Sequence, residues 1–91
     1  MARNIDVDID ELKRFLEVLK DFQEITSDKL SAVQSDWTRC NESWQGDAKN
    51  EFTKGFEQTE ISIKSALDAG EDACQWLKDF HEILEEFEGY R

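Results

Sequence analysis

The feature that most constrains the fold is the spacing of apolar residues, three and four apart along almost the whole of a chain that has no proline. Such spacing places side chains on one face of an α-helix. Only four glycines interrupt the pattern, and Gly46 lies at its midpoint. The sequence therefore predicts an all-α fold of one domain, residues 1–91, with helices at about 8–42 and 47–88 and a turn at 43–46.

Two apolar stripes carry this prediction. The first has two polar members, Gln23 and Thr26, and consists of Ile9, Leu12, Leu16, Leu19, Gln23, Thr26, Leu30, Val33, Trp37, Cys40 and Trp44. The second consists of Phe52, Phe56, Thr59, Ile63, Ala66, Gly70, Ala73, Leu77, Phe80, Leu84 and Phe87. Heptad-like spacing of this kind is typical of helices that pack lengthwise against one another.

The ends of both helices have recognisable signals. Asp8 suits an N-cap, Glu11 three residues later suits a capping box, and Val7 with Leu12 suits a hydrophobic staple. Asp47 suits the N-cap of the second helix. Gly89 is a plausible end for that helix.

The turn predicts how the two stripes meet. Gly46 can adopt the positive φ with which a chain leaves a helix, and Trp44 can cover the open end of the hairpin. Capping the core is the simplest role for Trp44. Folding at 43–46 pairs residues whose numbers sum to about 89, so Leu12 faces Leu77 and Leu16 faces Ala73. The small residues of segment 65–74 then lie opposite Phe15, Leu19 and Phe22, large against small.

A second set of apolar residues lies outside these stripes: Phe15, Val18, Phe22, Ile25, Trp76 and Ile83. A single hairpin would leave them in water, and apolar patches of this kind usually mark interfaces. We expect a second hairpin to cover them in a four-helix bundle. A broad core that closes without a partner is the alternative.

The net charge of −11 excludes some classes of partner. A protein that binds the phosphates of nucleic acid needs lysine and arginine, and so does one that binds an anionic membrane surface. Acidity most often keeps a helical protein soluble, and a basic partner or mimicry of nucleic acid are the alternatives. We expect no signal peptide and no membrane insertion, because no apolar run is long enough for either.

The sequence offers little for catalysis. Cys40 and Cys74 would lie roughly 37 Å apart along the hairpin, so we expect two buried free thiols and no disulfide. His81, the only histidine, is expected at the surface or at the edge of the interface. We expect no metal, no cofactor and no enzymatic activity. The glutamates near the C-terminus predict either a solvated tail or a segment ordered by a basic partner.

A chain of this length with Trp44-Gln45-Gly46 at the middle of a helical hairpin resembles the WXG100 (ESAT-6-like) family. The segment "NIDVDIDELKRF" resembles that family's lead-in and first helix, although Ile9 stands where many members have proline. The resemblance implies homodimers or heterodimers with a similar hairpin, in type VII secretion. It also implies export from the cytoplasm without a cleaved signal, and contacts with a secreted toxin or effector and with the motor ATPase.

In the family, a turn and the partner's C-terminal tail together form the secretion signal. The resemblance implies that Trp44 and Gly46 are the turn half. The usual tail motif, Tyr-x-x-x-Asp/Glu, would begin at Tyr90, which only Arg91 follows in this sequence. A broader tail pattern matches the spacing of Trp76, Phe80, Ile83 and Phe87, but Phe80 stands where the acid belongs. We therefore expect a partner to supply the tail, or a cytoplasmic chaperone-like or structural hairpin that is not exported.

Overall fold

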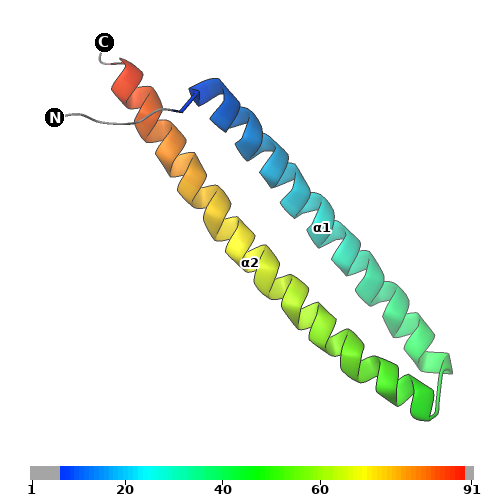
Figure 1. Cartoon of the computed structure of the whole chain (residues 1–91). Coiled ribbons are helices and arrows are strands. Elements are labelled where there is room, and N and C mark those ends of the chain that lie inside the picture. The colour runs from blue at the N-terminus through cyan, green and yellow to red at the C-terminus, as the bar shows by residue number, and fades with distance from the viewer. Residues whose placement is uncertain (1–6, 90–91) are drawn as a thin grey trace.

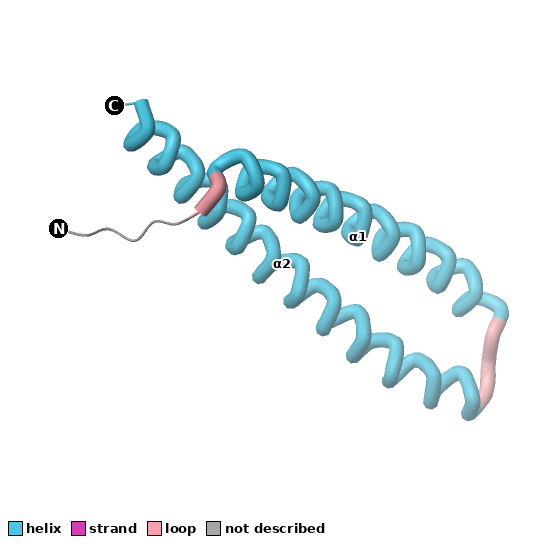
Figure 2. The backbone as a smooth tube through the Cα atoms, turned by 45° about the horizontal axis from the view of Figure 1, so that its top comes forward, coloured by secondary structure: helices cyan, strands magenta, loops and turns pink. Residues whose placement is uncertain are grey.

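The computed structural model describes residues 7–89. It consists of two antiparallel helices, α1 from Ile9 to Ser43 and α2 from Asp47 to Gly89, joined by one short turn (Figure 1). The hairpin is long and narrow, with extents of 68 × 21 × 15 Å. The turn lies at one end and the outer ends of both helices at the other (Figure 2). The prediction of an all-α fold with two long helices is confirmed.

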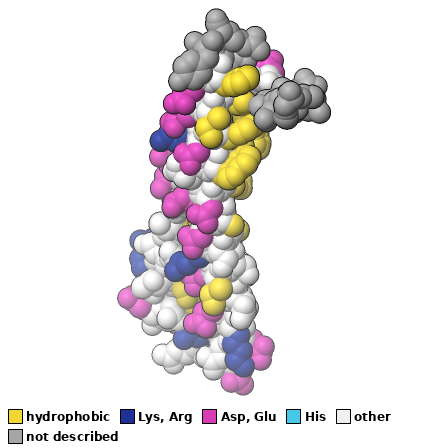
Figure 3. All heavy atoms as spheres, turned by 90° about the vertical axis from the view of Figure 1, so that its left-hand side faces the viewer, with side chains coloured by type: hydrophobic (Ala, Val, Ile, Leu, Met, Phe, Trp, Pro, Cys, Tyr) yellow, Lys and Arg dark blue, Asp and Glu magenta, His cyan; other side chains and the backbone are white. Residues whose placement is uncertain are grey.

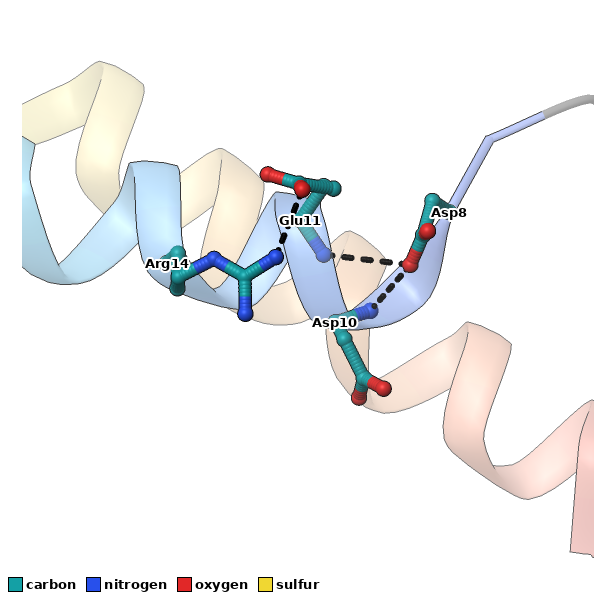
Figure 4. A network of polar contacts seen from close by, with 4 residues as sticks. All are labelled: Asp8, Asp10, Glu11 and Arg14. Atoms are coloured by element: carbon teal, nitrogen blue, oxygen red, sulfur yellow. Dashed lines mark hydrogen bonds and ion pairs between the residues drawn. The ribbon is translucent and has the colours of Figure 1, made fainter.

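The start of α1 is set by Asp8. Its carboxylate accepts hydrogen bonds from the backbone N–H groups of Asp10, at 3.0 Å, and Glu11, at 3.2 Å (Figure 4). These bonds satisfy two N–H groups that have no partner inside the helix. The side chain of Glu11 forms an ion pair with Arg14 at 2.6 Å. Asp8 is therefore the predicted N-cap, while Glu11 is directed toward Arg14 instead of completing a capping box.

The role of Gly46 in the turn differs from the prediction, because it belongs to a different helix. Gly46 has φ of +110°, but α1 has already ended at Ser43, and Trp44 is extended. The carbonyl oxygen of Gly46 accepts the first hydrogen bond of α2, from the N–H of Asn50 at 3.1 Å. Gly46 therefore starts α2 instead of ending α1. Asp47 is the first helical residue and not the N-cap, because Gly46 holds that position.

Little of the interface between the helices is fully buried. Leu16 and Leu84 are the buried apolar residues in the described part of the chain, 8% and 3% exposed. Most other interface residues are half-buried. Trp37 lies against Phe52, with ring centroids 5.2 Å apart, in the register that the sequence predicts. A single hairpin thus has a narrow core, because each helix buries one stripe.

The predicted interface residues of α2, the second stripe, are partly wrong. Phe56, Ile63, Gly70, Leu77 and Leu84 lie at the interface as predicted. At three intervening positions the interface residue is displaced by one toward the C-terminus. Where the sequence predicts Thr59, Ala66 and Ala73, which are exposed, the interface holds Glu60, Leu67 and Cys74. The larger side chains of Leu67 and Cys74 fill space that alanine would leave empty.

This rotation of α2 also changes the ends of both stripes. Phe87 is 54% exposed, and His81 is 8% exposed where Phe80 was predicted to be the interface residue. The expectation that His81 lies at the surface or at an edge is therefore wrong, because it is buried. Its Nδ1 lies 3.5 Å from a carboxylate oxygen of Glu85, and its buried Nε2 has no hydrogen-bond partner among residues 7–89. In the first stripe, Val33 and Cys40 are exposed.

A polar contact crosses the centre of the hairpin. The side-chain amide of Gln23 donates a hydrogen bond to the carbonyl oxygen of Leu67, at 2.8 Å. A Cβ atom on Gly70 would collide with this amide. Gly70 therefore makes the room that Gln23 occupies. The small segment lies against Gln23 and not, as predicted, against Phe15 and Phe22, which are 55% and 59% exposed.

Both cysteines are free. The prediction that their thiols are buried is wrong for Cys40, which is exposed, and Cys74 is only half-buried. Neither described helix is both long and apolar enough to cross a membrane.

Candidate interaction surfaces

The turn end of the hairpin is an aromatic cluster. Trp44 meets Trp37 edge to face, with ring centroids 6.2 Å apart, and contacts Phe52 at 5.7 Å. Phe56 completes the cluster, 5.3 Å from Trp37. Aromatic pairs in these geometries stabilise a fold beyond the area that they bury. Trp44 remains half-exposed, so it both closes the end of the hairpin and presents part of its ring to solvent.

The turn requires glycine at position 46 because of the positive φ there, and not because a larger side chain would collide with a neighbour. Nothing lies within 4 Å of the Cβ that alanine would add at Gly46 or at helical Gly55. Gly46→Ala should lower the free energy of unfolding by about 1–2 kcal/mol, because alanine is strained at φ +110°. Gly55→Ala should raise it by about 0.5–1 kcal/mol, since alanine favours a helix. Urea unfolding of the two variants tests this, and equal effects would contradict it.

The other end of the molecule has a large apolar surface. We define the terminal apolar face by the six residues that the sequence predicts as a partner interface. Their exposed fractions run from 55% to 66%, and they are Phe15, Val18, Phe22, Ile25, Trp76 and Ile83. All belong to the half of the hairpin nearest its termini, and Figure 3 shows hydrophobic side chains gathered there.

The six residues lie on one side of the hairpin. Phe15 and Phe22 each precede an interface residue of α1, while Trp76 and Ile83 precede Leu77 and Leu84 of α2. Each step along an α-helix turns by about 100°. Because the helices are antiparallel, the preceding residues of both helices turn toward the same side. Half-buried Phe80 occupies the equivalent position between Trp76 and Ile83, and exposed Ala69 and Ala73 continue the row toward the middle of α2. The face is thus continuous across both helices.

The candidate tail residues belong to this same surface. Trp76 stacks on Phe80, with ring centroids 5.2 Å apart and planes at 23°. Ile83 and Phe87 are more than half exposed, whereas Phe80 is half-buried. Tyr90 lies outside the described residues. The pattern Trp76, Phe80, Ile83 and Phe87 therefore forms an exposed apolar edge on the last turns of α2.

The opposite side of the hairpin is polar. A groove of about 670 Å³ runs between α1 and α2, and Lys20, Lys64 and Lys78 line it together with Glu24 and Glu71. Each of these residues follows an interface residue, so the groove lies on the side away from the terminal apolar face. Among residues 7–89, no group of three histidine, cysteine or acidic side chains is placed to hold a metal ion.

The sequence indicated that these six apolar residues are exposed, but not that they share one side. It missed Ile61, and it placed Val33, Phe52 and Phe87 at the interface although they are exposed. The signal for a shared side was present, because each of the six precedes an interface residue. This spacing could predict a common side only once the structure showed which residues of α2 contact α1.

Comparisons with known proteins give no relative. No family model matches the chain, and neither curated proteins nor solved structures give a match. The resemblance to WXG100 proteins therefore rests on the residues and on the hairpin.

Proposed function

We propose that this chain is a WXG100-like, non-enzymatic protein of a type VII secretion system. It acts as a secreted substrate, or as the dimeric partner that targets a secreted cargo. The observation that carries the proposal is the position of Trp44 and Gly46 at the tip of an antiparallel hairpin. Trp44 is anchored on Trp37 yet half-exposed, which suits a residue that a second protein recognises.

The proposed assembly is a four-helix bundle formed by two hairpins. The terminal apolar face supports it, because a single hairpin leaves these side chains more than half exposed. Soluble monomers rarely expose a continuous apolar surface of this kind without using it as an interface. A second helical hairpin covers such a face along its length. The partner would be another WXG100-like chain, and the assembly would deliver its cargo to the motor ATPase.

A second candidate is a cytoplasmic chaperone-like or structural hairpin that binds a partner and stays in the cell. The tail pattern favours it, since Phe80 occupies the place of the acid in the broader motif. That residue stacks on Trp76 within the hairpin. In this case the apolar edge on α2 would serve only to bind the partner.

Export of Trp44→Ala from a host with a type VII system tests the leading proposal. We expect secretion to be largely lost while the cellular amount and the assembly with the partner persist, because Trp44 lies far from the terminal apolar face. Gly55→Ala, elsewhere on α2, is the control and should be exported like the natural chain. Full export of Trp44→Ala would contradict the role of the turn. Retention of the natural chain in the cytoplasm would favour the second candidate.

A further inference from the structure

The charges around the terminal apolar face are segregated by sign. Four exposed acids lie two positions after one interface residue and two before the next, at the outer edges of the face. We call them the acidic rim: Asp21 and Asp28 on α1, and Asp72 and Asp79 on α2. Figure 3 shows acidic side chains running alongside the hydrophobic ones. Both edges of the face are therefore acidic.

The basic residues of this half lie mostly on the other side. Lys13, Lys20, Lys64 and Lys78 each follow an interface residue, and three of the four line the polar groove. In the part of the chain that the structure describes, two bases lie on the side of the face. Arg14 is paired with Glu11, and Lys29 stands at the far end of the face. Lysine thus does not balance the acidic rim.

This arrangement decides between two kinds of occupant. In a symmetric pair of hairpins, the same surface of each copy meets the other. Because both long edges are acidic, either orientation of a second copy brings acid against acid. Like charges that face each other across an interface disfavour the wrong partner. A partner with lysine or arginine beside its own apolar face meets no such repulsion.

We propose that the terminal apolar face binds a helical partner whose apolar face is flanked by lysine and arginine, in preference to a second copy of this chain. The proposal deepens the proposed function, on which it rests only for the idea that the face is an interface. The apolar side chains supply the buried area, and the acidic rim selects the partner.

A recharged copy of the chain can serve as the probe. The rim-reversed copy carries Asp21→Lys, Asp72→Lys and Asp79→Lys, all at exposed positions. The new lysine at 21 lies within one turn of Glu17 and Glu24, and the one at 79 lies three residues before Glu82. Such spacings favour a helix, so the copy should fold. The control copy carries Glu24→Lys, Asp68→Lys and Glu71→Lys on the polar groove, with the same change in net charge.

Binding of each labelled copy to the natural chain is measured by sedimentation in dilute and in concentrated salt. In dilute salt the rim-reversed copy should bind roughly tenfold or more tightly than either the control copy or a labelled natural chain, and salt should shrink this difference by screening. Phe22→Ser in the rim-reversed copy should abolish the gain. Equal binding of the two recharged copies, or tightest binding between natural chains, would overturn the proposal.

The natural chain alone gives an independent check that needs no recharged copy. Its self-association should strengthen as salt is added, because screening weakens the repulsion between acidic rims. Self-association that weakens with salt, or does not respond to it, would overturn the proposal. Loss of either result leaves the export test untouched, since that test depends on Trp44 at the other end of the hairpin.

Discussion

Replacing Leu84 by alanine should lower the free energy of unfolding by about 2–4 kcal/mol, the largest effect expected for a single truncation in this chain. Leu84 is 3% exposed and is the most deeply buried apolar residue of α2 in the described part of the chain. Its removal leaves a cavity in a core that has few other buried residues. Since small domains are stable by only about 5–15 kcal/mol, the variant should unfold at clearly lower urea concentration.

Ile83 provides a matched control one residue away. It is 61% exposed and lies on the terminal apolar face. In a dilute solution, where the hairpin is alone, Ile83→Ala should change the unfolding free energy by less than about 1 kcal/mol. Equal losses for the two variants would mean that the interface between α1 and α2 does not follow the line through Leu77, His81 and Leu84.

Replacing Phe22 by serine should weaken self-association in concentrated salt roughly a hundredfold. Phe22 is 59% exposed, and burying the rest of its ring contributes about 1.5 kcal/mol. A symmetric dimer loses this contribution twice, and each 1.4 kcal/mol corresponds to about a tenfold change in affinity. Sedimentation equilibrium measures the change. Circular dichroism should show that the helices are retained.

Ile61 tests whether this loss depends on position. Its side chain is also 59% exposed, but it lies in the half of α2 near the turn, outside the terminal apolar face. Ile61→Ser should leave self-association unchanged. If the two serine variants weakened association equally, exposed apolar area in general, and not this face, would drive assembly.

The architecture follows from local features that the sequence displays openly. Asp8 provides the cap of α1, and spacings of three and four place Leu16 and Leu84 on inner faces. Gly46 provides the positive φ at the turn. The interface of α2 was harder to predict, because Ala66 and Leu67 are both apolar and adjacent. Which one faces α1 depends on the rotation of the whole helix, and that is a property of packing.

The same rotation explains the errors in the candidate surfaces. It buries His81 and exposes Phe87, so neither has the burial that its residue type suggests. It also leaves Ala69 and Ala73 on the side that carries Trp76. Sequence spacing found the six residues of the terminal apolar face one by one. Whether these residues form one face with an acidic rim depends on how the two helices are rotated against each other. Only the structure showed that rotation.

We infer above all that the terminal apolar face is an interface that a single hairpin leaves uncovered. The most direct test is the molar mass of the natural chain, by light scattering after size exclusion, over a dilution series in dilute and in concentrated salt. An interface at this face predicts a mass that approaches twice the chain's 10.7 kDa in concentrated salt and falls toward that of the single chain in dilute salt. A folded chain that stays at 10.7 kDa at every concentration and salt would contradict it.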